Sequence, residues 1–125
     1  MFSHIVVGCN DADKSFAFYD ALFTAVGGKP GSRITPEKAA YMHNGGLLMV
    51  TRPLNGEPAT HANGGTIGLA MASPEQVDAW HAAGVAAGGT TCEDPPGKRD
   101  HLKMYLAYLR DPAGNKLCAM YRYPA

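Results

Sequence analysis

The two halves of this chain repeat the same order of structural signals, and this repeat limits the fold more than any other feature. Each half begins with a short apolar segment, at 2–8 and 66–72, that predicts a strand covered on both faces. Each segment leads into a stretch with helical spacing of apolar residues. The glycine pairs Gly27-Gly28 and Gly88-Gly89 then end the predicted helices, and they lie 61 residues apart. A unit of about 60 residues therefore fills the chain twice.

Both predicted helices carry start signals and an apolar stripe. Asp11 is the expected N-cap of the first, and Ser73 is that of the second, where Pro74 and Gln76 occupy the first helical position and the capping-box position. The apolar stripes follow the spacing 3, 4, 3 in both helices. Their members are Phe16, Tyr19, Phe23 and Val26 in the first half, and Val77, Trp80, Gly84 and Ala87 in the second.

Each predicted helix is followed by turn-rich sequence and a hairpin. Asn44-Gly45 predicts a type I′ turn, and residues 111–115 predict a longer loop. We therefore expect an α+β fold in a single domain over 1–125, with one βαβββ module at about 1–53, a linker at about 54–64 and a second module at about 65–125. A ferredoxin-like sandwich built from two βαβ units is the alternative.

Composition excludes several classes of partner. Eleven basic and eleven acidic residues give zero formal charge, which argues against nucleic-acid or anionic-membrane binding. No apolar run is long enough to cross a bilayer, and the N-terminus lacks the features of a signal peptide. Cys9, Cys92 and Cys118 are widely spaced and are expected to be free thiols in a reducing compartment. We therefore expect a cytoplasmic protein with a small organic ligand.

A set of short motifs stands out beside the repeat. They are the His4-Ile5-Val6-Val7 strand, the Asn10-Asp11 and Ala17-Phe18-Tyr19-Asp20 segments, and the closing run from Arg110 to Leu117, which contains Asp-Pro-Ala-Gly-Asn. Together they resemble the glyoxalase, bleomycin-resistance and extradiol-dioxygenase family, the vicinal oxygen chelate superfamily. The resemblance covers essentially the whole chain. It implies a mixed sheet curled into a cup, with the helices on its outer face and a divalent metal or a small ligand inside.

The resemblance also implies four metal positions, and most of them lack a ligand here. His4 stands at the first, and its partner in the repeat is taken to be Ile67. The carboxylate expected seven residues after Asp111 is replaced by Cys118, and the matching position in the first half falls at Leu47 or Leu48. His4 and Cys118 alone would form a two-ligand pair, which rarely holds a metal. We therefore predict no metal site and no cofactor. The alternative is a divalent metal bound at a different place, with His43 or His101 as a ligand.

The expected ligand pocket combines the cup positions with the loop before the last hairpin. His4 is the best candidate for proton transfer, because histidine is the side chain most often used for that role. Cys118 is interpreted as a buried, inert thiol, and Arg99 as a candidate to grip a carboxylate or phosphate. The expected pocket residues are His4, Leu48, Ile67, Arg99, His101, Tyr105, Tyr108 and Cys118.

Three functions remain open from the sequence. The first is a small-molecule-binding protein of the bleomycin-resistance type without the standard metal site. The second is a metal-dependent lyase, isomerase or dioxygenase with a degenerate or relocated site, an enzymatic role that rests on the resemblance alone. The third is a catalytically silent dimerisation module, and a homodimer is expected because such cups are often completed between subunits.

Overall fold

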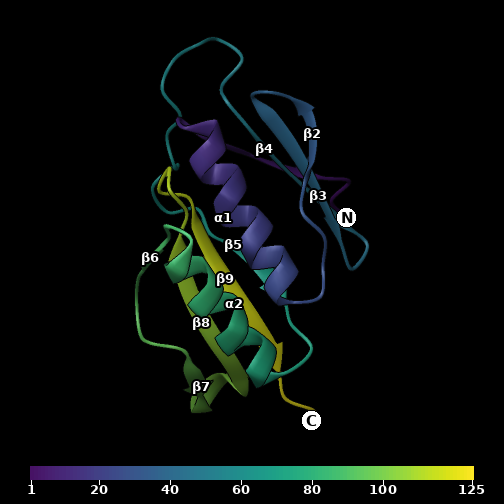
Figure 1. The fold of residues 1–125 in the computed structure, drawn as a ribbon. Helices are drawn as coiled ribbons and strands as arrows, with labels where there is room; N and C mark the ends of the chain where they lie inside the picture. Colours follow the sequence, from purple (N-terminus) through teal and green to yellow (C-terminus); the bar gives the residue numbers. More distant parts are fainter.

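A computed structural model describes all residues from 1 to 125, and it divides the chain into two halves of similar topology (Figure 1). The first half contains β1 (Ile5–Gly8), α1 (Ala12–Ala25), β2 (Ser32–Thr35), β3 (Lys38–His43) and β4 (Gly46–Thr51). The second contains β5 (Ile67–Ala70), α2 (Pro74–Ala86), β6 (Thr90–Thr91), β7 (Gly97–Arg99), a 3₁₀ turn at Asp100–Leu102, β8 (Met104–Arg110) and β9 (Lys116–Arg122). The predicted α+β fold with a repeated module is confirmed.

The two sheets have corresponding strand orders. The first runs β1-β4-β3-β2, and the second runs β5-β9-β8-β6, with β7 added beside β8. In each sheet the strand that precedes the helix pairs in parallel with the last strand of its half, and the other pairs are antiparallel. Because each half builds its own sheet, the ferredoxin-like alternative is wrong.

Both helices begin and end where the sequence predicts. The Asp11 carboxylate accepts the Lys14 N–H, and the Ser73 hydroxyl accepts the Gln76 N–H, so both N-caps are formed. The Gln76 side chain accepts the N–H of Ala72 at 2.7 Å. Gly27 and Gly88 adopt φ of 87° and 102° just beyond the helices, a conformation that glycine tolerates best.

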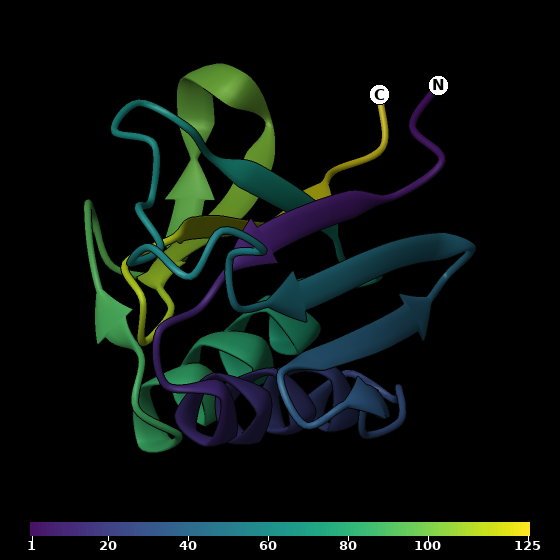
Figure 2. The same ribbon diagram turned by 90° about the horizontal axis from the view of Figure 1, so that it is seen from above.

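The hydrophobic core lies between the helices and one face of the sheets. Both helices cover the same side of the two sheets, as Figure 2 shows. Phe16, Tyr19, Trp80 and Val77 are almost fully buried there. Gly84 lets α2 approach both β8 and α1, because a Cβ at this position would lie 2.3 Å from Leu109 Cδ1 and 3.0 Å from Leu22 Cδ2. Neither helix combines the length and the apolar character that crossing a membrane requires.

Candidate functional site

A mostly apolar cavity lies where the edge strands β1 and β5 face each other. No backbone hydrogen bond joins these two strands, since β1 pairs only with β4 and β5 only with β9. The gap opens into a cavity of about 280 Å³, which we call the seam cavity, bordered by β1, β5, the β3–β4 hairpin and α1. Eight of its thirteen lining residues are hydrophobic, so the cavity suits an apolar group.

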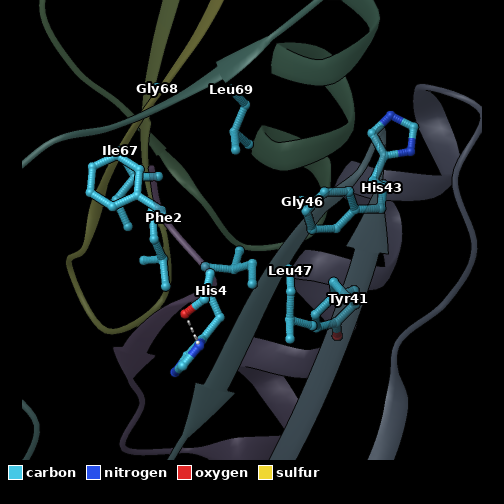
Figure 3. Close-up of a pocket in the computed structure, with 13 residues that line it drawn as sticks. Phe2, His4, Tyr41, His43, Gly46, Leu47, Ile67, Gly68 and Leu69 are labelled. Carbon is cyan, nitrogen blue, oxygen red and sulfur yellow. Dashed lines mark hydrogen bonds between the residues drawn. The ribbon is translucent and has the colours of Figure 1, made fainter.

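The aliphatic lining comes from opposite sides of the seam (Figure 3). Ile67 and Leu69 enter from β5, while Leu47 and Leu48 enter from β4. Leu48 is 6% exposed and belongs to the core, and Ile67 packs against that core. The expected pocket residues Leu48 and Ile67 therefore border the cavity from the side that faces the helices.

Two imidazoles supply the polar groups of the seam cavity. His4 and His43 lie at opposite ends of it in Figure 3. His4 is exposed, and its Nδ1 lies 2.8 Å from the Ser3 hydroxyl. His43 is half-buried beside the Phe23 ring, at 5.8 Å between ring centres, and its imidazole makes no hydrogen bond within the chain. Each imidazole has a ring nitrogen left to bind a polar atom of a ligand.

Tyr41 also borders the seam cavity, but its hydroxyl is already bound. The hydroxyl donates to Asp20 Oδ1 at 2.8 Å and lies 3.1 Å from the Phe16 carbonyl oxygen. Burial and this hydrogen bond raise the pKa of Tyr41. Burial alone would raise the pKa of Asp20, but hydrogen bonds from Arg33, Gly31 N and Tyr41 outweigh burial and lower it. Tyr41 therefore shapes the cavity wall with its ring.

Tyr108, Cys118 and Arg99 gather on the opposite face of the second sheet, away from α2. Tyr108 and Cys118 are direct neighbours across β8 and β9. Burial raises the pKa of the Cys118 thiol, although a hydrogen bond with Tyr108 lowers it in part, so the thiol stays protonated near neutral pH. The Arg99 guanidinium donates to the carbonyl oxygens of Gly97, Asp94 and Pro95. Arg99 thus ties its own loop together instead of offering a free fork to a ligand.

The remaining expected pocket residues lie elsewhere. Tyr105 is three residues from Tyr108 on one strand, so the two side chains point to opposite faces. Tyr105 faces α2, where its hydroxyl donates to Asp78 at 2.8 Å. His101 is exposed in the 3₁₀ turn and does not border the seam cavity. Of the eight expected pocket residues, His4, Leu48 and Ile67 border the seam cavity, and the other five do not.

Strand register corrects the positions at which a metal would be expected. Ile5 pairs with Leu48 in the first sheet and Ile67 pairs with Leu117 in the second, and all four side chains face the core, so the two pairs correspond. The counterpart of His4 is therefore Thr66 rather than Ile67. By the same register, the counterpart of Cys118 is Met49 rather than Leu47 or Leu48. Alignment of the halves by their sequence patterns is wrong by one residue, which exchanges the two faces of a strand.

The corrected set does not fit a hard divalent cation. It contains one imidazole, a hydroxyl, a thioether and a buried protonated thiol, whereas such ions prefer carboxylate oxygens and imidazoles. Across the whole chain, no three side chains of His, Cys, Asp or Glu come together in a way that could hold a metal.

The closing Asp-Pro-Ala-Gly-Asn run joins the two halves. Asp111 is 3% exposed and accepts hydrogen bonds from the Tyr19 hydroxyl at 2.6 Å and from the N–H groups of Ala113 and Asn115. The Asn115 side chain donates to Asp111 and to the Gly8 carbonyl oxygen, both at 2.8 Å. The closing run in the second half is therefore hydrogen-bonded to α1 and β1 in the first half.

Comparisons with known proteins agree with this architecture. The model of the Glyoxalase/Bleomycin resistance protein/Dioxygenase superfamily matches residues 1–119. A glyoxalase/bleomycin resistance protein from Albidiferax ferrireducens T118 is 56% identical, with a TM-score of 0.92 over 98% of this chain and 99% of that one. A glyoxalase-related enzyme from Fulvimarina pelagi shares the fold at 23% identity, with a TM-score of 0.78 over 98% and 88% of the two chains. No curated protein matches the chain.

Proposed function

Because the chain belongs to the glyoxalase/bleomycin resistance protein/dioxygenase superfamily, we propose that it binds a small, mainly apolar organic molecule in the seam cavity without the standard metal set. The cavity itself carries this proposal. Its volume of about 280 Å³ and mostly hydrophobic lining suit a compact organic group, and the imidazoles of His4 and His43 would orient a polar atom. The same apolar surface would exclude water from a bound ligand.

Filling the cavity tests the proposal. Gly68 borders the seam cavity, and a Cβ there would meet no atom within 4 Å, so a large side chain can be added beside the cavity without disturbing the core. We expect wild-type protein to bind the uncharged fluorescent probe 1-N-phenylnaphthylamine saturably, and Gly68→Phe to lose that binding. Ala70→Phe is the matched control, since Ala70 lies on the same face of β5 but outside the seam cavity. Equal binding by wild type and Gly68→Phe would rule the seam cavity out.

A metal-dependent lyase, isomerase or dioxygenase is the second candidate. The observation in its favour is that two of its proposed ligands, His4 and His43, border one cavity. Stoichiometric zinc, nickel, manganese or iron in protein purified without chelators, lost in His4→Ala and His43→Ala, would favour this enzyme. Metal content near zero in the wild type would leave the binding protein as the better account.

We also propose that the protein is a cytoplasmic homodimer. The face of the first sheet that points away from α1 is uncovered, and on it Val6 and Met42 are 46% and 77% exposed. Apolar side chains in this position favour burial against a second copy. Light scattering should give twice the monomer mass for wild type and a reduced mass for Met42→Lys. A wild-type monomer at high concentration would contradict the dimer. The free cysteines favour a reducing compartment.

A further inference from the structure

A second cavity lies on the linker side of the same seam. Its volume is about 280 Å³, and it is bordered by the end of β1, residues 60–66 of the linker, the start of β5 and the start of β9. The linker passes beside the loop between β8 and β9 in Figure 2. We call this second cavity the linker cavity. Ile67 borders both cavities, so the two sites are neighbours along one seam.

The polar groups of the linker cavity are suited to an anion. None of its eleven lining residues is acidic, and His61 and Lys116 are the two that carry or can acquire a positive charge. The hydroxyls of Thr60 and Thr66 and the imidazole of His61 make no hydrogen bond within the chain. Free donors beside an ammonium group are what a carboxylate or phosphate requires.

His61 is held in place by the closing loop. A Cβ on Gly114 would lie 2.9 Å from His61 Cδ2, so the imidazole packs directly over this glycine. Gly114 also has a φ of 96°, which few other residues adopt. The glycine of the closing run thus provides the space in which His61 lies at the cavity.

Lys116 already interacts with an internal anion. Its ammonium contacts the Glu93 carboxylate and lies 5.1 Å from the centre of the Tyr108 ring. The Lys116 side chain is 21% exposed, whereas that of Glu93 is 46% exposed and comes from a loop outside the cavity. Glu93 and Tyr108 both lie outside the cavity, so the ammonium reaches an anion there by turning away from Glu93. Because the Glu93 carboxylate is partly exposed, solvent screens the ion pair and the exchange costs little.

From this arrangement we infer that the linker cavity binds a small anionic group, a carboxylate or a phosphate. Lys116 and His61 recognise the charge, Thr60 and Thr66 supply hydroxyl donors, and Glu93 competes with the ligand for Lys116. The ligand class of this site extends the proposed function, because a molecule that spans the seam would carry an acidic group next to its apolar body. The anion site itself does not depend on the seam cavity being occupied.

The test uses inorganic phosphate and acetate in separate titrations of the full chain at constant ionic strength, followed by amide chemical shifts. We expect shifts at 60–66 and 114–116 with one or both anions. Lys116→Met should weaken the affinity at least about tenfold, since it removes a charged hydrogen bond. Glu93→Gln should strengthen it, because the competitor is gone. Lys98→Met is the matched control, since Lys98 is exposed and outside the cavity.

The two anions distinguish the source of the charge. A response to phosphate alone supports a phosphate group, and a response to acetate alone supports a carboxylate. No response to either, or equal affinity in wild type and Lys116→Met with an unchanged melting temperature, overturns the inference. Gly68→Phe should bind the anion as wild type does, so a failure of the seam cavity and a failure of the linker cavity are separable.

Discussion

The buried hydroxyl of Tyr19 provides a direct test of how the closing loop joins the two halves. Tyr19 is fully buried in α1, and its hydroxyl donates to Asp111 Oδ2 at 2.6 Å across the junction. Burial and the neighbouring Asp111 carboxylate raise the pKa of Tyr19 well above its usual range. The hydroxyl therefore remains a donor at every pH at which the protein is handled.

Tyr19→Phe removes this donor and leaves the ring in place. A hydrogen bond to a charged group contributes about 1.5–3 kcal/mol, and Asp111 keeps its bonds from the backbone of Ala113 and Asn115, so we expect a loss of about 2 kcal/mol. For 125 residues the entropy of unfolding is about 0.26 kcal/mol/K, and the melting temperature should fall by about 8 °C.

Differential scanning calorimetry and urea unfolding measure this loss. Tyr121→Phe is the control, because the Tyr121 ring packs against Tyr123 while its hydroxyl makes no hydrogen bond in the chain, and its stability should change by less than about 0.5 kcal/mol. If Tyr19→Phe melted within about 2 °C of wild type, the junction through Asp111 would not contribute to stability as the contacts imply.

Two other perturbations test the packing at the helix end and the buried tyrosines. A Cβ at Gly89 would lie 2.8 Å and 3.1 Å from the carbonyl oxygens of Gly84 and Arg110, so Gly89→Ala should destabilise the fold by about 2 kcal/mol in urea, while Gly68→Ala should not. Because the folded-state pKa values of Tyr19 and Tyr41 are raised, their stabilising effect is complete below the unfolded value of about 10 and is lost as pH rises above it. Urea unfolding between about pH 9 and 11.5 should show this fall, with a shallower slope in Tyr41→Phe; a flat profile would contradict it.

Most of the fold is predictable from local signals along the chain. Asp11 and Ser73 cap the helices, and Gly27 and Gly88 follow their ends, because capping depends on residues within one turn of each other. The Asn44-Gly45 turn also forms as predicted, with φ of 50° and 81° at its two residues. Such features require only short-range chemistry, which a single sequence displays.

The site is harder to predict, because it depends on pairings between distant strands. Alternation along β1 and β5 identifies two faces in each strand but not which residues stand opposite each other. Matching the halves by their first apolar strands makes Ile67 the counterpart of His4, at an offset of 63 residues. The core-facing pairs Ile5–Leu48 and Ile67–Leu117 give that position to Thr66 instead. An error of one residue therefore places two core-facing side chains, Ile67 and Leu48, at positions expected to bind a metal.

The linker shows a different limit of sequence reasoning. Its Pro, Gly and Asn content predicts irregular backbone, which is correct, and that prediction directs attention away from its side chains. His61 gains significance only because Gly114, 53 residues later, packs beneath its imidazole. The glycine in the closing run could have drawn attention to this contact, since a residue without a Cβ often marks the close approach of another segment. The glycine alone does not indicate which residue approaches it, so the linker cavity with His61 and Lys116 could be found only from the folded chain.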